Sequence, residues 1–242
     1  MKKGFVALAF LIAICLTACS NKIPPVEDRL PVSETMGNNP ENSISQEETE
    51  DAENEKIQIK SILQVQTDTR LGSGVLWEKL EEEWIVVTAA HVVEGLQEVD
   101  VYLVPEDKIL PATVEVVEGL DLAFLRVSIR SLAQKTKEEY GAVKQMQDTI
   151  EEGATVFAKG YTPDGELCEF AGKVLEDWIY VEDFDNYMLL CDCPAQAGMS
   201  GGAVVTAEGC LAGLICGENK EGTLAVLPIG VIKSEYQIFQ GK

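Results

Sequence analysis

Residues 84–93 read WIVVTAAHVV, an apolar run that ends around the only histidine of the chain, His91. Residues 198–202 read GMSGG and set Ser200 among glycines, where the lack of Cβ atoms lets backbone N–H groups approach a bound carbonyl. A serine becomes a nucleophile when a histidine takes its proton. Because no histidine follows Ser200, the α/β-hydrolase order of serine, acid and histidine is excluded.

An acid that holds the histidine in the correct tautomer is expected between these two blocks. Residues 119–125 read GLDLAFL and place Asp121 thirty positions after His91. Asp100 and Asp107 are weaker candidates for the acid. Each block alone has a plainer interpretation, such as a core histidine, a turn-capping aspartate or a serine in a glycine-rich hairpin. The three blocks in this order favour a catalytic interpretation, because the plainer ones need three coincidences.

The three blocks resemble those of trypsin-like serine proteases, and most of all the protease domain of bacterial HtrA (Deg-type) proteins. The shared motifs are GSG at residues 72–74, HVV at residues 91–93 and GMSGGA at residues 198–203, and the likeness extends over residues 69–234. The resemblance implies an all-β, chymotrypsin-like fold of two antiparallel β-barrels with a cleft for an extended peptide between them.

The resemblance also implies a role for each candidate residue. His91 is the general base, Asp121 orients it, and Ser200 is the nucleophile that forms an acyl-enzyme. The backbone N–H groups of Gly198 and Ser200 form the oxyanion hole. No metal or cofactor is expected, since a single histidine excludes a two-histidine metal site.

One position departs from the family, at Met199, where digestive trypsins carry aspartate and the bacterial branch usually asparagine. The departure removes a polar side chain that steadies the oxyanion loop. Two alternatives follow: a preformed loop, or a loop that becomes ordered when a substrate or partner binds.

The specificity pocket is expected to be apolar. Trypsins carry an aspartate six residues before the serine, and here that position is Pro194. Ala225 and Val226 are expected as wall residues, and Cys216 on the strand that walls the cleft. We therefore expect a small or medium apolar side chain on the acyl side of the cut bond, rather than lysine or arginine.

The pattern of residues 56–242 predicts one domain, with a first barrel at about residues 57–130 and a second at about 150–228. Short β-type runs separated by glycines and acidic turns are typical of such barrels. They are Trp84–Thr88, Val99–Val104, Thr113–Val117, Thr155–Ala158, Trp178–Val181, Tyr187–Cys191, Ala203–Thr206 and Leu211–Cys216. Helix is expected at residues 131–147, as a bridge between the halves, and at the C-terminus, where four apolar residues share one face: Ile229, Ile232, Tyr236 and Phe239.

The N-terminal residues have the pattern of an export signal. Two lysines precede a short apolar stretch, and residues 16–19 read LTAC, which resembles the bacterial lipobox. We expect residues 1–18 to be a signal peptide, Cys19 to carry a lipid, and residues 19–55 to be a disordered acidic linker. The expected location is the extracytoplasmic side of a bacterial membrane. An ordinary cleaved signal or a retained short anchor are the alternatives.

Composition excludes some functions. The 242 residues are 46% apolar, enough for a sizeable core, and the net charge of −22 repels nucleic acid. After Cys19 the chain has five more cysteines, an odd number, so at least one is unpaired within the chain. A disulfide from Cys168 to Cys191 or Cys193 and a set of buried free thiols are both open.

These patterns together predict a membrane-anchored serine endopeptidase that acts on proteins or peptides. The alternative is a catalytically silent, protease-like lipoprotein that binds peptides or partner proteins, with Met199 as the lesion. A redox or metal-binding cysteine protein is a third, weaker hypothesis. The oligomeric state is not predicted.

Overall fold

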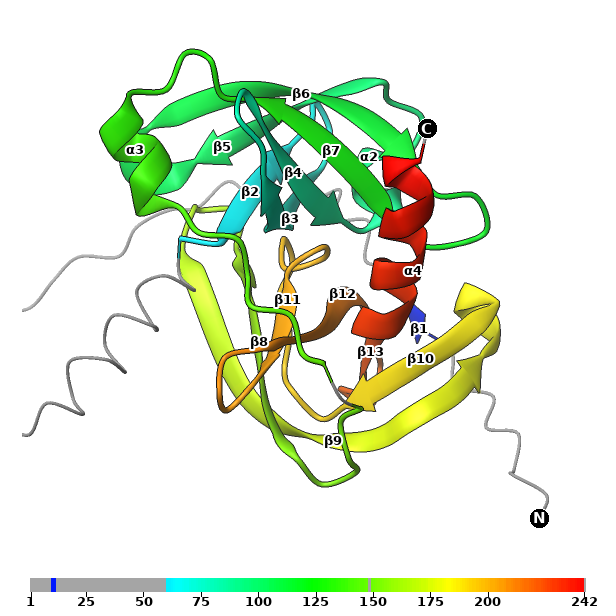
Figure 1. The fold of residues 1–242 in the computed structure, drawn as a ribbon. Helices are drawn as coiled ribbons and strands as arrows, with labels where there is room; N and C mark the ends of the chain where they lie inside the picture. Colours follow the sequence, from blue (N-terminus) through cyan, green and yellow to red (C-terminus); the bar gives the residue numbers. More distant parts are fainter. Residues whose placement is uncertain (1–9, 12–59, 148, 242) are drawn as a thin grey trace, which may run out of the picture.

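The computed structural model describes residues 10–11, 60–147 and 149–241 of the chain. They form two antiparallel β-barrels, with the helix α4 (Ile229–Gln240) alongside both (Figure 1). The expected two-barrel fold with a short C-terminal helix is confirmed. The expected signal peptide and linker lie outside the described residues, except for Phe10 and Leu11. Within the described part of the chain, no helix has the length and apolar character that crossing a membrane requires.

The first barrel is a closed sheet in the order β2-β3-β4-β7-β6-β5. Alternating side chains face its core: in β5 the residues Val99, Val101 and Leu103 are buried between exposed or half-exposed neighbours. The strands are β2 (Ile62–Gln66), β3 (Leu71–Lys79), β4 (Glu83–Thr88), β5 (Glu98–Leu103), β6 (Lys108–Val116) and β7 (Ala123–Ser128).

The second barrel has the order β12-β11-β8-β9-β10-β13 and closes through pairing of β12 with β13. A two-residue strand, β1 (Phe10–Leu11), adds antiparallel to β12 at Glu218 and Asn219. The six barrel strands are β8 (Thr155–Tyr161), β9 (Leu167–Val181), β10 (Asn186–Cys191), β11 (Ala203–Thr206), β12 (Leu211–Asn219) and β13 (Leu224–Pro228).

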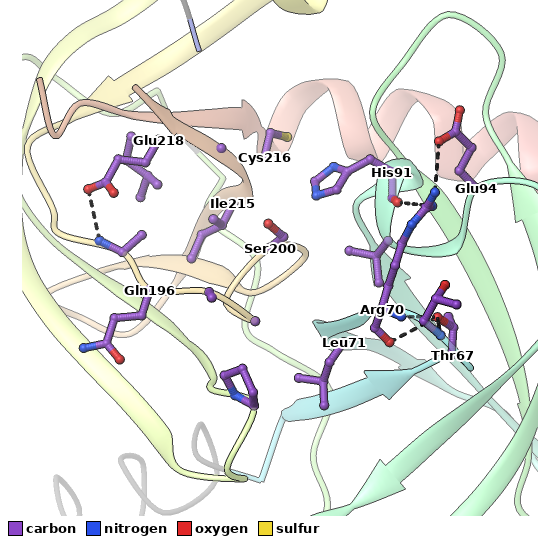
Figure 2. A pocket seen from close by; sticks show the side chains of 18 of the residues that line it. Thr67, Arg70, Leu71, His91, Glu94, Gln196, Ser200, Ile215, Cys216 and Glu218 are labelled. Carbon is purple, nitrogen blue, oxygen red and sulfur yellow. Dashed lines mark hydrogen bonds and ion pairs between the residues drawn. The ribbon is translucent and has the colours of Figure 1, made fainter. Parts of the chain in front are cut away.

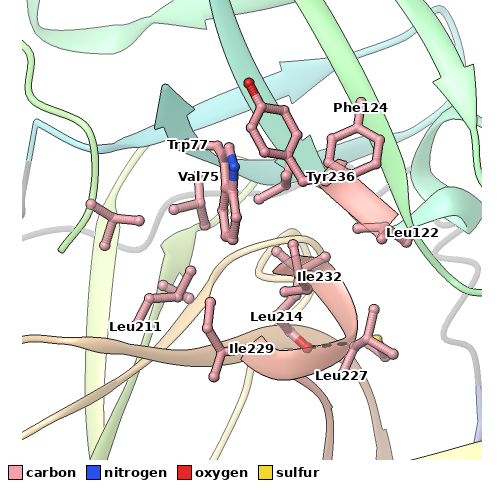
Figure 3. Packing of buried hydrophobic residues seen from close by; sticks show 14 of the residues in the cluster. Val75, Trp77, Leu122, Phe124, Leu211, Leu214, Leu227, Ile229, Ile232 and Tyr236 are labelled. Atoms are coloured by element: carbon pink, nitrogen blue, oxygen red, sulfur yellow. Dashed lines mark hydrogen bonds between the residues drawn. The ribbon is translucent and has the colours of Figure 1, made fainter. Parts of the chain in front are cut away.

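One apolar cluster joins the two barrels through α4 (Figure 3). Tyr236 meets Trp77 of β3 edge to face, with ring centroids 5.6 Å apart, and Phe239 stacks on Phe124 of β7 at 4.6 Å. The four apolar residues expected on one face of this helix are its buried residues. The helix therefore holds the barrels in a fixed relation and with them the cleft between them.

The helix expected at residues 131–147 is mostly extended chain. Only α3 (Gln134–Glu139) is helical, because the backbone that follows bonds to both barrels instead. Val143 N–H donates to Leu76 O at 2.9 Å, and Leu211 N–H donates to Lys144 O at 2.7 Å. Tertiary hydrogen bonds thus override the helix propensity of this charged stretch, although it does bridge the two barrels as expected.

Three short helical turns complete the described elements. They are α2 (Ala90–Val93), which follows β4, and the 3-10 turns η1 (Val104–Glu106) and η2 (Glu182–Phe184). The sequence patterns did not indicate α2, because four residues are too few to show helical periodicity.

Candidate active site

His91 is presented by the turn of helix that follows β4. Its neighbours Val92 and Val93 are buried in the core of the first barrel, which anchors the turn, whereas the His91 side chain is 19% exposed. Arg70 Nη1 donates a hydrogen bond of 2.7 Å to the carbonyl oxygen of His91. Both contacts fix the backbone from which the imidazole projects.

Asp121 lies against His91, as expected, whereas Asp100 and Asp107 are on and after β5. The ring Nδ1 of His91 is 2.9 Å from Oδ2 and 3.1 Å from Oδ1 of Asp121, and His91 N–H donates to Oδ1 at 2.9 Å. A carboxylate accepts hydrogen bonds, so Nδ1 carries the proton and Nε2 is left with a lone pair. This is the tautomer that a general base needs.

The loop that carries the serine consists of two consecutive turns. Met199 N–H donates to Gln196 O at 3.1 Å, and Gly202 N–H donates to Met199 O at 2.9 Å. The third residue of the first turn, Gly198, has φ +90°, and that of the second, Gly201, has φ +80°. Positive φ at this position favours glycine, which explains two of the glycines in the motif.

Ser73, the middle residue of the GSG motif, ties this loop to the first barrel. Its Oγ donates to Gly198 O at 2.8 Å and accepts from Tyr161 N–H at 2.8 Å, while its N–H donates to Ser200 O at 2.8 Å. A Cβ on Gly201 would lie 2.2 Å from Ser73 O. The sequence pattern marks GSG only as a family motif and does not assign Ser73 this role.

The N–H groups expected to form the oxyanion hole are those of Gly198 and Ser200. No hydrogen bond from either N–H to another described residue is present, whereas the carbonyl oxygen of Gly198 is engaged by Ser73. Both donors therefore have no other partner among the described residues, as an oxyanion hole requires. Donors held in advance of the reaction stabilise negative charge without reorganising.

Met199 replaces the missing polar side chain with an apolar anchor. Its side chain is fully buried in the core of the second barrel, and its Sδ accepts a hydrogen bond from Gln196 N–H at 3.3 Å. A Cβ on Gly160 of β8 would lie 2.8 Å from the Met199 Cα, so the loop packs directly on the strand. The loop is thus held in place by burial, as in the preformed alternative.

His91 and Ser200 both face a cleft of about 660 Å³ between the barrels (Figure 2). The described residues form no hydrogen bond between the Ser200 hydroxyl and the imidazole. Such bonds are often long without substrate and tighten when it binds. The cleft brings the three candidate catalytic residues together, since Asp121 supports His91 from behind.

Only one of the expected pocket residues lines the cleft. Cys216 lines the cleft, as the extra residue of a bulge in β12 between Ile215 and Gly217. Ala225, Val226 and Pro194 do not line the cleft: Ala225 is buried in the cluster that joins the barrels, Val226 in the core of the second barrel, and Pro194 is exposed. In their place Leu224, Glu218, Ala195 and Gln196 form the wall beside Ser200.

The thiol of Cys216 is neutral. Burial, and after it the negative charge of Asp121, hold the pKa of this thiol well above its usual range. Its Sγ lies 4.0 Å from the carbonyl oxygen of Asp121. Cys216 thus packs behind the aspartate as a protonated thiol rather than as a nucleophile.

The cysteines of the described residues are free thiols, so no disulfide joins Cys168 to Cys191 or Cys193. Cys191 and Cys193 are both buried. Residues 60–147 and 149–241 contain no group of three or more side chains suited to hold a metal ion.

Two barrels with a histidine–aspartate pair facing a serine across their cleft define the chymotrypsin-like class of fold. Residues 72–214 match the trypsin-like peptidase domain family. The chain belongs to this family.

Similar proteins agree with this assignment. Two strains of Staphylococcus epidermidis have a protein named "Serine protease HtrA-like" that is 25% identical over 182 residues, 69% of this chain. The chain spans only 30% of the length of these relatives.

Solved structures share the fold. The Rv3671c protease of M. tuberculosis H37Rv, in an inactive mutant form, superposes with a TM-score of 0.63 at 20% identity, over 84% of this chain and 97% of that chain. A serine endoprotease from Yersinia pestis gives a TM-score of 0.62 at 19% identity, over 79% and 67% of the two chains.

Proposed function

We propose that the protein is a serine endopeptidase that cleaves peptide bonds through an acyl-enzyme on Ser200. The observation that carries the proposal is the 2.9 Å contact of His91 Nδ1 with Asp121, in a cleft that Ser200 also faces. A histidine held in this tautomer has Nε2 free to take a proton, which a histidine buried for packing alone does not need.

The reaction starts when Ser200 Oγ attacks the substrate carbonyl and His91 Nε2 takes the hydroxyl proton. Asp121 stabilises the imidazolium that forms and stays ionised. The N–H groups of Gly198 and Ser200 donate to the oxyanion. His91 then gives its proton to the leaving amine, and water, deprotonated by His91, hydrolyses the acyl-enzyme.

The edge of β12 beside the cleft suits an extended peptide. In the structure this edge already accepts β1 antiparallel at Glu218 and Asn219. An added strand gains backbone hydrogen bonds whatever its sequence, while pockets beside it select side chains. Proteins or peptides are therefore the proposed substrates.

The proposed location is the outer side of a bacterial membrane, with a lipid on Cys19. Two acyl chains anchor a protein stably, whereas a single chain gives only marginal binding. Growth with radioactive palmitate should label the parent and not Cys19→Ser. Equal labelling of both proteins would show that Cys19 is not the lipid-carrying residue and would reject this part of the proposal.

The test of activity uses a fluorophosphonate, which reacts with a serine only when a base activates it. The full-length protein should be labelled and Ser200→Ala should not, and the same substitution should lower kcat by about a millionfold. Absence of labelling in a folded parent would instead favour the catalytically silent, peptide-binding alternative. That alternative has one observation in its favour, the missing hydrogen bond between Ser200 and His91.

A further inference from the structure

A carboxylate stands in the wall of the cleft on the side of Ser200 away from Arg70. Glu218 belongs to the stretch of β12 that lines the cleft, residues 215–219, and Figure 2 shows it and Arg70 on opposite sides of the serine. Its side chain is partly buried. Gly201 N–H donates to Ile215 O at 2.8 Å, so Ser200 lies at the Ile215 end of this stretch. A substrate that pairs antiparallel, as β1 does, therefore brings the part before the cut bond, its acyl part, to Glu218.

The Glu218 carboxylate is held in place and still has room for a ligand. Its Oε1 accepts a hydrogen bond of 3.3 Å from Ala195 N–H, so the side chain is tied to the segment that leads to Ser200. A carboxylate has about four acceptor positions, and this contact uses one of them. None of the described cations forms an ion pair with Glu218.

The wall next to this carboxylate is apolar. Ile215 and Leu224 line the cleft beside Glu218. Lysine and arginine bury their methylene stems on apolar surface and keep the charged end at a polar group. The combination of apolar walls and a carboxylate matches such a side chain.

The other charged groups of the cleft do not neutralise the negative charge of Glu218. Arg70 is occupied by the carbonyl oxygen of His91 at 2.7 Å and by Glu94 at 3.6 Å. Asp68, two positions before Arg70 in the chain, also lines the cleft but is exposed. Lys220 lines the rim but is exposed. The acyl side of the cleft therefore has one partly buried negative charge.

We propose that Glu218 makes the acyl-side pocket a site for lysine or arginine. The sequence led us to expect an apolar side chain in this pocket, because Pro194 stands at the position where trypsins carry their acid. The proposal reverses that expectation, since here the acid, Glu218, comes from β12. The inference rests on the proposed function for its substrate, but the pocket itself also predicts binding of a small cation.

The first experiment compares two fluorogenic peptides that differ only in lysine or norleucine on the acyl side of the cut bond. Norleucine keeps the stem and lacks the charge. A hydrogen bond to a charged partner typically changes an equilibrium by tenfold to about a hundredfold. The full-length parent should prefer the lysine peptide by about that factor in kcat/KM, and Glu218→Gln should bring the ratio close to one.

Glu221→Gln is the matched control, because it removes the same charge from an exposed residue outside the cleft lining. In this variant the preference for the lysine peptide should persist.

A second readout does not depend on catalysis. Calorimetry should show that benzamidine binds the parent more tightly than the neutral isostere benzamide, and that Glu218→Gln loses the difference. If both peptides are cleaved and kcat/KM for the norleucine peptide equals or exceeds that for the lysine peptide, the inference is overturned and the proposed function stands. No cleavage and no fluorophosphonate labelling, with benzamidine binding retained, would reject the proposed function and keep the cation site. Equal binding of benzamidine and benzamide would overturn the inference in either case.

Discussion

The two halves of the candidate site are held by different forces. In the first barrel, His91 is fixed by two hydrogen bonds of 2.9 Å, one from its ring and one from its backbone N–H, to the charged carboxylate of Asp121. In the second barrel, Ser200 is positioned by backbone turns and by the buried Met199 side chain, and its hydroxyl is not bonded to His91. One half depends on electrostatics and the other on packing and backbone conformation.

This difference explains how a methionine can serve at position 199. The loop needs a fixed backbone, and a side chain buried in the barrel core supplies it as well as a polar contact does. Ser73 adds the connection that sets the distance between the halves. Substitutions in the first half should therefore change catalysis alone, whereas substitutions in the second half should also change stability.

Among substitutions that leave the nucleophile Ser200 in place, the largest effect is expected for Asp121→Asn, which tests the first half. An amide in place of the carboxylate favours the wrong tautomer of His91, so kcat should fall by about ten-thousandfold. Hydrolysis of a fluorogenic peptide measures this, and the urea midpoint checks that the fold survives. A kcat within tenfold of the parent would show that His91 does not depend on this carboxylate.

The next effect tests the backbone of the second half. In Gly198→Ala the Cβ would lie 2.6 Å from Tyr161 O at φ +90°, so the turn must shift and move one oxyanion donor. Loss of one such donor typically lowers kcat by about a hundredfold to a thousandfold.

Gly153→Ala is the matched control for that variant. It has the same backbone strain, with φ +81°, but a Cβ there meets no atom within 4 Å. It should reduce stability by about 1 to 2 kcal/mol and leave kcat unchanged. Equal loss of kcat in both variants would mean that strain alone, rather than donor placement, controls the rate.

The smallest effect on the rate, and the clearest on stability, is expected at Met199. Met199→Ala empties a buried site and should lower the free energy of unfolding by about 2 to 5 kcal/mol, whereas Met199→Leu keeps the volume and should cost less than about 1.5 kcal/mol. Urea unfolding followed by tryptophan fluorescence compares the two. If alanine is as well tolerated as leucine, packing of Met199 is not what holds the loop.

Most of the fold was predictable from local patterns. Alternation of buried and exposed residues marks strands such as β5, and the apolar face of α4 appears directly in the spacing of Ile229, Ile232, Tyr236 and Phe239. The conformation of the stretch after Ser131 was not predictable. Its charged residues favour a helix, but its backbone instead forms hydrogen bonds with Leu76 and Leu211, which are distant in sequence. Local propensity carries no information about such partners.

The sequence by itself determined which residues are available for the chemistry, since a lone histidine before a glycine-flanked serine leaves only one arrangement of base and nucleophile. Only the tertiary structure decided how they are held and what the cleft presents. The contact of Ser73 with Gly198 joins residues 125 positions apart, and Glu218 lies in the cleft wall two residues after a bulge at Cys216. Contacts of this kind arise from the packing of two barrels, and no local pattern of residues encodes them.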